Sequence, residues 1–127
     1  MAPTRYTGCV GTFTLPITIS DQQLATSEEV EALVDTGATN TVLPAELLQR
    51  LGIQPHRKST FQLADGRELE LEIGRAWVKV DGQREYTQVV FGPPGTEPIL
   101  GAITLEEMNL AVDPVAGRLI PVNRLLK

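Results

Sequence analysis

Alternating apolar and polar residues predict a strand near the beginning of the chain. Over Phe13–Ser20 every odd position is apolar and most even positions are Thr or Ser, which is the period of a strand with one buried face. Pro16 lies within this stretch, and because proline cannot donate a hydrogen bond to a neighbouring strand, we expect an edge strand. A turn over residues 21–27 then leads to a second predicted strand, Val30–Val34.

Two predicted hairpins follow, each built around an Asp-Gly dipeptide. Their strands are Phe61–Leu63 with Leu69–Ile73, and Ala76–Val80 with Tyr86–Phe91. The dipeptides between them are Asp65-Gly66 and Asp81-Gly82. Both residues of an Asp-Gly pair tolerate the positive φ of a tight hairpin turn, so we expect such a turn at each site.

Only two segments have helical features. Pro44–Leu51 has proline at a first-turn position and Gly52 as its stop, and Thr104–Met108 has Thr104 and Glu107 at the spacing of a capping box. The elements together predict a mostly β fold, a small closed or folded β-barrel with one or two short helices.

The length of the chain limits it to one core. A chain of 127 residues buries roughly two thirds of its unfolded surface, enough for a single domain over residues 1–127 but not for two lobes with separate cores. If the chemistry needs two lobes, a second chain must supply one of them.

Charge and hydropathy exclude several classes of partner. The net charge is -5, with 11 Lys and Arg against 16 Asp and Glu, and no basic cluster suggests nucleic acid or an anionic membrane. No apolar run is long enough to span a bilayer. We therefore expect a cytoplasmic protein with no nucleic-acid or membrane partner.

The single cysteine and single histidine exclude a zinc site and an internal disulfide, so we expect no metal and no cofactor. Cys9 and His56 could form a thiol-protease dyad. However, Cys9 lies in a glycine-flanked segment without a helix start to activate the thiol. We expect His56, between two polar or turn-forming neighbours, in a solvated turn.

The strongest chemical signal is Asp35-Thr36-Gly37, directly after the apolar residues Ala32–Val34. A carboxylate carried into apolar surroundings is costly unless hydrogen bonds or a function compensate. A Thr hydroxyl can donate and accept, and glycine lets the backbone approach a neighbour closely. An ordinary Asx turn is the alternative interpretation.

A second segment, Pro98–Ala102, carries an apolar strand to a glycine, Gly101, and is followed by the second predicted helix. Together, Ala32–Pro44, the Asp65-Gly66 hairpin, Gly92–Pro94 and Ile99-Leu100-Gly101 resemble a retropepsin-like aspartic protease. The resemblance covers approximately Phe13–Val122, which is most of the chain.

The resemblance implies a role for each matching residue. Asp35 would be catalytic together with Asp35 of a second identical chain, Thr36 would join the two active-site loops, and Gly37 would offer its backbone to the substrate. A flap over Phe61–Glu68 would close on a peptide or protein substrate. The remaining implied substrate-binding residues are Ala38, Thr39, Leu63, Ala64, Asp65 and Gly66.

The resemblance also implies parts that support the site and the dimer. Ile99, Leu100 and Gly101 match the hydrophobic-Gly motif that packs beneath the active-site loop. Homodimers of the family are held by strands from the chain termini, for which Arg118–Val122 is the best apolar candidate and Leu125-Leu126 the next.

Two departures from retroviral members stand out. Those members commonly carry an Asp at the position of Thr39 and an Arg at that of Ala102, which form a salt bridge near the dimer contact. Losing both charges together leaves neither one buried and unpaired. The flap carries Asp65, Gly66 and Arg67 in place of a glycine-rich tip.

The implied mechanism follows from repulsion between like charges. Two Asp35 carboxylates about 3 Å apart cannot both ionise, so the pair would share one proton, one member acting as base and the other as acid. The sequence thus predicts a homodimeric aspartic endopeptidase. The alternative is a catalytically silent relative that uses the same dimer and groove to bind peptides or scaffold an assembly.

Overall fold

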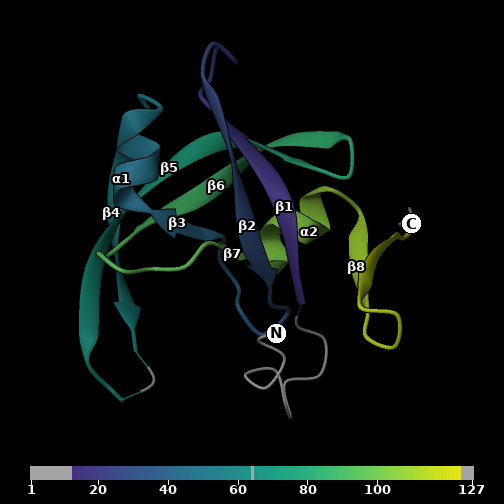
Figure 1. Ribbon diagram of the computed structural model, residues 1–127. Helices are drawn as coiled ribbons and strands as arrows, with labels where there is room; N and C mark the ends of the chain where they lie inside the picture. The colour runs from purple at the N-terminus through teal and green to yellow at the C-terminus, as the bar shows by residue number, and fades with distance from the viewer. Residues whose placement is uncertain (1–12, 64, 124–127) are drawn as a thin grey trace, which may run out of the picture.

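The computed structural model describes residues 13–63 and 65–123, which form mostly β structure with two short helices. In chain order the elements are β1 Phe13–Ser20, β2 Ser27–Val34, β3 Val42–Pro44, α1 Ala45–Arg50, β4 Pro55–Gln62, β5 Glu68–Val80, β6 Gln83–Gly92, β7 Ile99–Leu100, α2 Ala102–Glu107, β8 Leu110–Asp113 and β9 Arg118–Pro121 (Figure 1).

Seven strands form one sheet that folds back on itself. The strand order is β1-β2-β7-β3-β6-β5-β4, and β1 also pairs with β5. The remaining strands, β8 and β9, form a separate two-stranded sheet beside α2 (Figure 1). The predicted mostly β fold is therefore present as a folded sheet.

Strand β1 has the predicted bounds, but it is only partly an edge. It pairs antiparallel with β2 along its whole length, from Phe13↔Val34 to Ser20↔Ser27. Its last three residues, Thr18–Ser20, also pair with β5. The edge prediction is wrong for these three residues, because the sheet folds over and brings β5 alongside them. Pro16 lies outside this second pairing, where its missing N–H is tolerated.

Strand β5 is a single strand of 13 residues, where the sequence predicted two. It pairs with β4 through its first half and with β6 through its second half. Gly74, at the changeover, pairs with both Pro55 of β4 and Val89 of β6, so the strand continues through it. A Cβ at this position would lie 3.0 Å from the Gln54 carbonyl oxygen and 3.1 Å from the Phe91 ring, which are tight contacts.

The two Asp-Gly turns differ from each other. At the β5–β6 turn both Asp81 and Gly82 have positive φ, 50° and 82°, as predicted. At the β4–β5 turn only Gly66 does, with φ 90°. Asp65 instead accepts a hydrogen bond from the backbone N–H of Arg67 at 3.0 Å.

The predicted helices form, with changed starts. In α1, Pro44 is the residue before the first turn and also ends β3, and Gly52 stops the helix with φ 76°. The capping box predicted for α2 is wrong. Gly101 precedes the helix, and Thr104 lies inside it with a fully buried hydroxyl that bonds to residues of other elements.

The hydrophobic core lies between the folded layers of the sheet and beneath α1. Its largest fully buried side chains come from β1, β3, α1, β5, β6 and β7: Ile17, Ile19, Leu43, Leu47, Leu48, Ile73, Val78, Val80, Val89, Val90 and Leu100, with Val34 from β2. The core thus reaches the ends of β2 and β7, where the Asp35 loop begins.

Within the described residues, no helix is long and apolar enough to cross a membrane.

Candidate active site

Asp35 is the first residue after β2, and backbone and side-chain hydrogen bonds hold it at the start of a loop. Its N–H donates to the carbonyl of Leu100 at 3.2 Å, and its own carbonyl accepts from the N–H of Ala38 at 3.0 Å. Its Oδ1 accepts from the N–H of Gly37 at 2.9 Å. These bonds fix both the backbone and the carboxylate of a partly exposed residue.

The rest of the tripeptide faces outward. Thr36 and Gly37 are exposed in the single chain, so their side chain and backbone are accessible to another molecule. A Cβ at Gly37 would lie 3.2 Å from Asp35 Oδ1, which is closer than most real Cβ contacts. The Asp35 carboxylate therefore leaves little space for a side chain at position 37, which favours glycine there.

The segment Ile99-Leu100-Gly101 lies directly against this loop. Strand β7 pairs parallel with the end of β2, with Val34 opposite Leu100, and antiparallel with β3. A Cβ at Gly101 would come within 2.4 Å of the Asn40 carbonyl group. Only glycine fits at this contact, so the loop rests on the β7 backbone.

Helix α2 adds two more bonds to the loop. The N–H groups of Ala102 and Ile103 donate to the carbonyls of Ala38 and Thr39, at 2.8 and 3.0 Å. At Thr39 and at Ala102, where this sequence has no charge, the contacts between loop and helix are therefore made by neutral backbone groups. The loop is held at both ends without charge.

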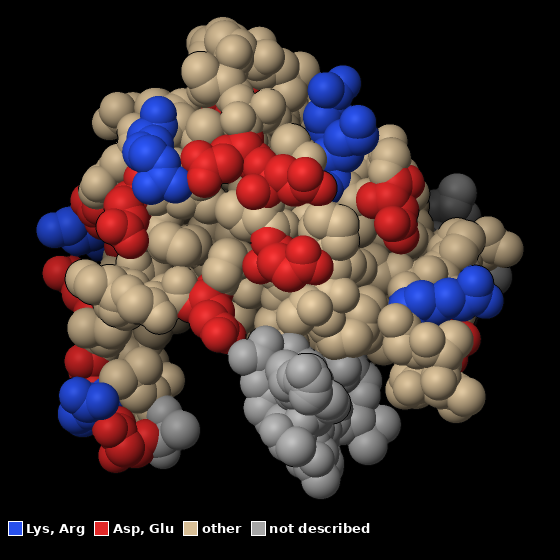
Figure 2. Space-filling model, viewed as in Figure 1, with Lys and Arg blue, Asp and Glu red and all other residues tan. Residues whose placement is uncertain are grey.

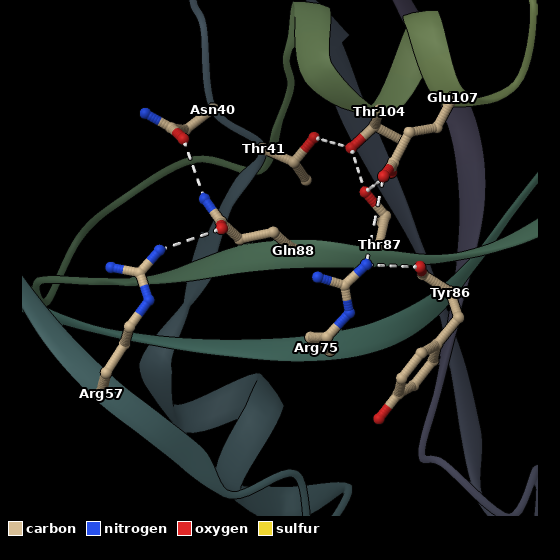
Figure 3. A network of polar contacts seen from close by, with 9 residues as sticks. All are labelled: Asn40, Thr41, Arg57, Arg75, Tyr86, Thr87, Gln88, Thr104 and Glu107. Atoms are coloured by element: carbon tan, nitrogen blue, oxygen red, sulfur yellow. Dashed lines mark hydrogen bonds and ion pairs between the residues drawn. The ribbon is translucent and has the colours of Figure 1, made fainter.

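A polar network lies beneath the loop (Figure 3). Gly101 N–H donates to Thr41 Oγ1 at 3.0 Å, and Thr104 Oγ1 is 2.6 Å from that of Thr41 and 3.0 Å from that of Thr87. Thr87 donates to Glu107 at 2.5 Å. The three hydroxyls are buried, and all of them are paired.

Two further side-chain hydrogen bonds lead to Asn40. Arg57 of β4 donates to the side-chain carbonyl of Gln88 in β6 at 3.3 Å, and the Gln88 amide donates to Asn40 Oδ1 at 3.2 Å (Figure 3). Asn40 is thereby held at the edge of the loop by a residue of β6, the strand that pairs with β3.

A pocket of about 310 Å³ lies between the Asp35 loop and the β4–β5 hairpin. Its lining is mainly apolar and consists of Ala38, Thr39, Asn40, Val42, Phe61, Gln62, Leu63, Leu69, Leu71, Val90 and Pro93. The hairpin projects away from the body of the molecule, which is hollowed beside it (Figure 2). We call this pocket the groove.

The groove brings together some of the residues that the sequence singled out. Ala38, Thr39 and Leu63 line it, whereas Asp65 and Gly66 lie at the exposed tip of the hairpin. Ala64 lies outside the described residues. The hairpin tip is closed by Leu63 N–H donating to the Arg67 carbonyl at 2.7 Å.

Most of the apolar lining was missed by the sequence interpretation. Phe61 lies opposite Leu69, and Leu71 is two residues further along the same strand, so all three project from one face of the hairpin. The alternation of Leu69 and Leu71 with glutamates was the available signal. It indicates that this face of the hairpin is apolar.

Charge near the hairpin tip affects titration. The pKa of Asp65 is lowered from its ordinary value of 3.8, first because the Arg67 N–H donates to it and then because the Arg67 side chain does. Their side-chain ion pair is 2.7 Å long and exposed.

On the face shown in Figure 2, acidic side chains gather across the middle, in front of β1 and β2, and basic ones lie toward the margins.

The other candidates do not join this site. His56 is an exposed residue of β4 and not of a turn, and it lines a different pocket of about 430 Å³ together with Arg75 and Tyr86. That larger pocket includes no residue of the Asp35 loop. Cys9 lies outside the described residues. Among those described, no three His, Cys, Asp or Glu side chains group closely enough to hold a metal ion.

The folded sheet, the Asp-Thr-Gly loop and the glycine after β7 beneath it define a retropepsin-like domain. A family model described as gag-polyprotein putative aspartyl protease matches residues 23–107. Because the match spans more than half of the chain, the protein belongs to this family.

Solved structures show the same fold. EIAV protease, in complex with the inhibitor HBY-793, matches with a TM-score of 0.56 and 24% identity, over 76% of this chain and 86% of that one. The retroviral protease-like domain of Ddi1 from Leishmania major matches with a TM-score of 0.54 and 21% identity, over 87% and 90%.

Simian foamy virus (mac) protease matches with a TM-score of 0.52 and 19% identity, over 74% of this chain and 94% of that one. No curated protein sequence gives a significant match. At these identities the structural matches establish the fold alone.

Proposed function

We propose that this protein is an aspartic endopeptidase that acts as a homodimer, with the two Asp35 carboxylates paired across the two-fold axis. The observation that carries the proposal is the Asp35 loop. Its carboxylate is held by Gly37, its backbone is held by Leu100, and it opens beside an apolar groove. The chain contains this tripeptide once, so a second copy must complete the pair.

The reaction is peptide-bond hydrolysis by an activated water. The paired carboxylates share one proton because like charges at short distance cannot both be ionised. The ionised member removes a proton from water, and the oxygen of that water attacks the scissile carbonyl carbon. The protonated member donates its proton to the carbonyl oxygen. Breakdown of the tetrahedral intermediate then releases the amine and the carboxylic acid.

The dimer proposal is supported by the C-terminal hairpin. Strands β8 and β9 pair only with each other among the described residues, so the outer edges of this hairpin have no strand partner in the single chain. One face of the hairpin packs on the core through Leu119, Leu110 and Val112. A second copy pairing with the free edge would stabilise it. Leu125-Leu126 lies outside the described residues.

The groove favours an extended peptide with an apolar side chain. Its floor is formed by Val42 and Val90, and the hairpin wall by Phe61, Leu69 and Leu71. Burial of an aliphatic side chain there contributes about 1.5–3 kcal/mol. Asn40, held by Gln88, offers a polar group at the rim.

Peptide-library cleavage by wild type and Asp35→Asn tests the proposal. Asn keeps the shape of Asp and can still accept the Gly37 hydrogen bond, so we expect a folded dimer whose activity is at least about 10³-fold lower. Sedimentation of both proteins at the assay concentration controls for loss of the dimer. Equal cleavage by both would refute the proposal. Peptide binding without any cleavage by wild type would identify a silent binding module.

A further inference from the structure

A continuous series of hydrogen bonds connects the backbone of Asp35 to Glu107 at the far end of α2. The first link is the Asp35 N–H donating to the Leu100 carbonyl at 3.2 Å. The same peptide unit presents the Gly101 N–H, which donates to Thr41 Oγ1 at 3.0 Å. The Leu100–Gly101 peptide is therefore hydrogen-bonded through both its carbonyl and its N–H, and it links the Asp35 backbone to Thr41.

Three threonine hydroxyls continue the series (Figure 3). Thr41, Thr104 and Thr87 come from the loop before β3, from α2 and from β6, and their Oγ1 atoms are separated by 2.6 and 3.0 Å in that order. Thr87 is 2.5 Å from Glu107 Oε1. All three threonines have 0% exposure, so no solvent competes for their hydroxyls.

The donors and acceptors along the series have one consistent arrangement. A backbone N–H only donates, so Thr41 accepts from Gly101. A carboxylate only accepts, so Thr87 gives its single proton to Glu107. Thr104 must then donate to Thr87, and Thr41 must donate to Thr104. Every hydrogen bond from Asp35 onward therefore points in the same direction, toward Glu107.

Such an arrangement is cooperative. In a low-dielectric interior, each hydrogen bond polarises the next, and an acceptor at the end fixes the direction of the whole series. Glu107 supplies that acceptor from a partly exposed position, with its other oxygen 4.0 Å from the Arg75 guanidinium. Without it, either oxygen of each threonine pair can be the donor, so the three hydroxyls lose their fixed order.

We propose that Glu107 is a positioning residue for Asp35, acting through Thr87, Thr104, Thr41 and the Leu100–Gly101 peptide. This inference rests on the proposed catalytic role of Asp35. Glu107 lies on the side of the network away from the groove and lines no part of it. Its removal is therefore expected to misplace the reacting group without altering the peptide contacts, which lowers kcat more than it raises KM.

The first test compares Glu107→Leu with Glu107→Gln. Gln keeps the length and an acceptor oxygen for Thr87, whereas Leu keeps the approximate volume and removes the acceptor. We expect Glu107→Leu to lower kcat about tenfold with KM within about twofold, and Gln to restore most of the rate. Glu46→Leu, an exposed substitution in α1, is the matched control and is expected to change neither constant.

A second readout is independent of activity. Amide hydrogen exchange at Asp35 and Gly101 is measured relative to Val78, a fully buried residue of β5 that reports global opening. We expect exchange at both amides to be about tenfold faster in Glu107→Leu and close to wild type in Glu107→Gln. Thr104→Val, which breaks the series in its middle, is expected to give the same pattern, with Thr104→Ser restoring it.

The outcomes separate the two proposals. Faster exchange at Asp35 and Gly101 together with an inactive wild type supports the hydrogen-bond series and refutes the protease function. Unchanged exchange in Glu107→Leu refutes the positioning role even if wild type cleaves peptides. A loss of kcat that Glu107→Gln does not restore also refutes it, because the effect then requires the charge and not the acceptor.

Discussion

Gly101 is the residue at which the Asp35 loop and β7 approach most closely. A Cβ there would lie 2.4 Å from both the carbon and the oxygen of the Asn40 carbonyl, and 2.9 Å from the Thr41 N–H nitrogen. These contacts are backbone atoms and cannot rotate away. The glycine is therefore required by sterics and not by its backbone angles.

We predict that Gly101→Ala lowers the free energy of unfolding by about 1–3 kcal/mol through overpacking, and also lowers activity because the Asp35 loop is displaced. Urea unfolding measures the first effect. The control is Gly117→Ala in the β8–β9 turn, which has open space but φ 67° and costs about 1 kcal/mol through the backbone alone. The account is wrong if Gly101→Ala is no more destabilising than this control and remains fully active.

Thr104 shows which kind of contact a local sequence motif cannot predict. The spacing of Thr104 and Glu107 suggested a local capping box, yet the Thr104 hydroxyl bonds to Thr41 and Thr87. These partners are 63 and 17 residues away in the chain. A local motif cannot reveal such partners, because only the folded sheet brings them together.

At the scale of elements, the periodicity of the sequence predicted individual strands better than it predicted where one strand continues into the next. The bounds of β1 follow directly from alternation, and the glycine after β7 was identified from its apolar context. The sequence predicted two strands, Leu69–Ile73 and Ala76–Val80, whereas β5 is continuous because Gly74 pairs with both Pro55 of β4 and Val89 of β6. The groove lining follows from the β4–β5 register, which the sequence leaves open.

The β4–β5 hairpin tip gives a prediction for pH. The pKa of Asp65 is lowered from 3.8 by hydrogen bonds from Arg67. The ionised Asp65 carboxylate therefore orders the hairpin tip fully above pH 3.8, and this effect is lost as the pH falls through the lowered pKa of Asp65 in the folded protein. In an NMR titration from pH 6 to about pH 2, the Arg67 amide is expected to shift with a midpoint below 3.8.

Asp65→Asn keeps an acceptor for the Arg67 N–H but has no proton to titrate, so the shift of the Arg67 amide in this range should disappear. Because both side chains are exposed, global stability should change little. A midpoint at or above 3.8, or the same titration in Asp65→Asn, would show that Arg67 does not hold this carboxylate.

At the scale of the whole molecule, the proposed dimer would complete the site with a second copy of the chain. Asp35 is partly exposed and Thr36 is exposed, on the side of the molecule where the groove opens. A carboxylate that works alone has no neighbour with which to share a proton. The dimer proposed above would cover this loop and supply that neighbour from the second copy.

Subunit mixing tests this central claim most directly. Wild-type protein is held at a fixed concentration at which sedimentation shows dimer, and increasing amounts of inactive Asp35→Asn are added and allowed to exchange subunits. Only dimers with two Asp35 carboxylates cleave, so activity should fall to about one half at equal amounts and about one tenth at a ninefold excess. Activity that stays constant while mixed dimers form would contradict the account, because each chain would then be catalytically complete.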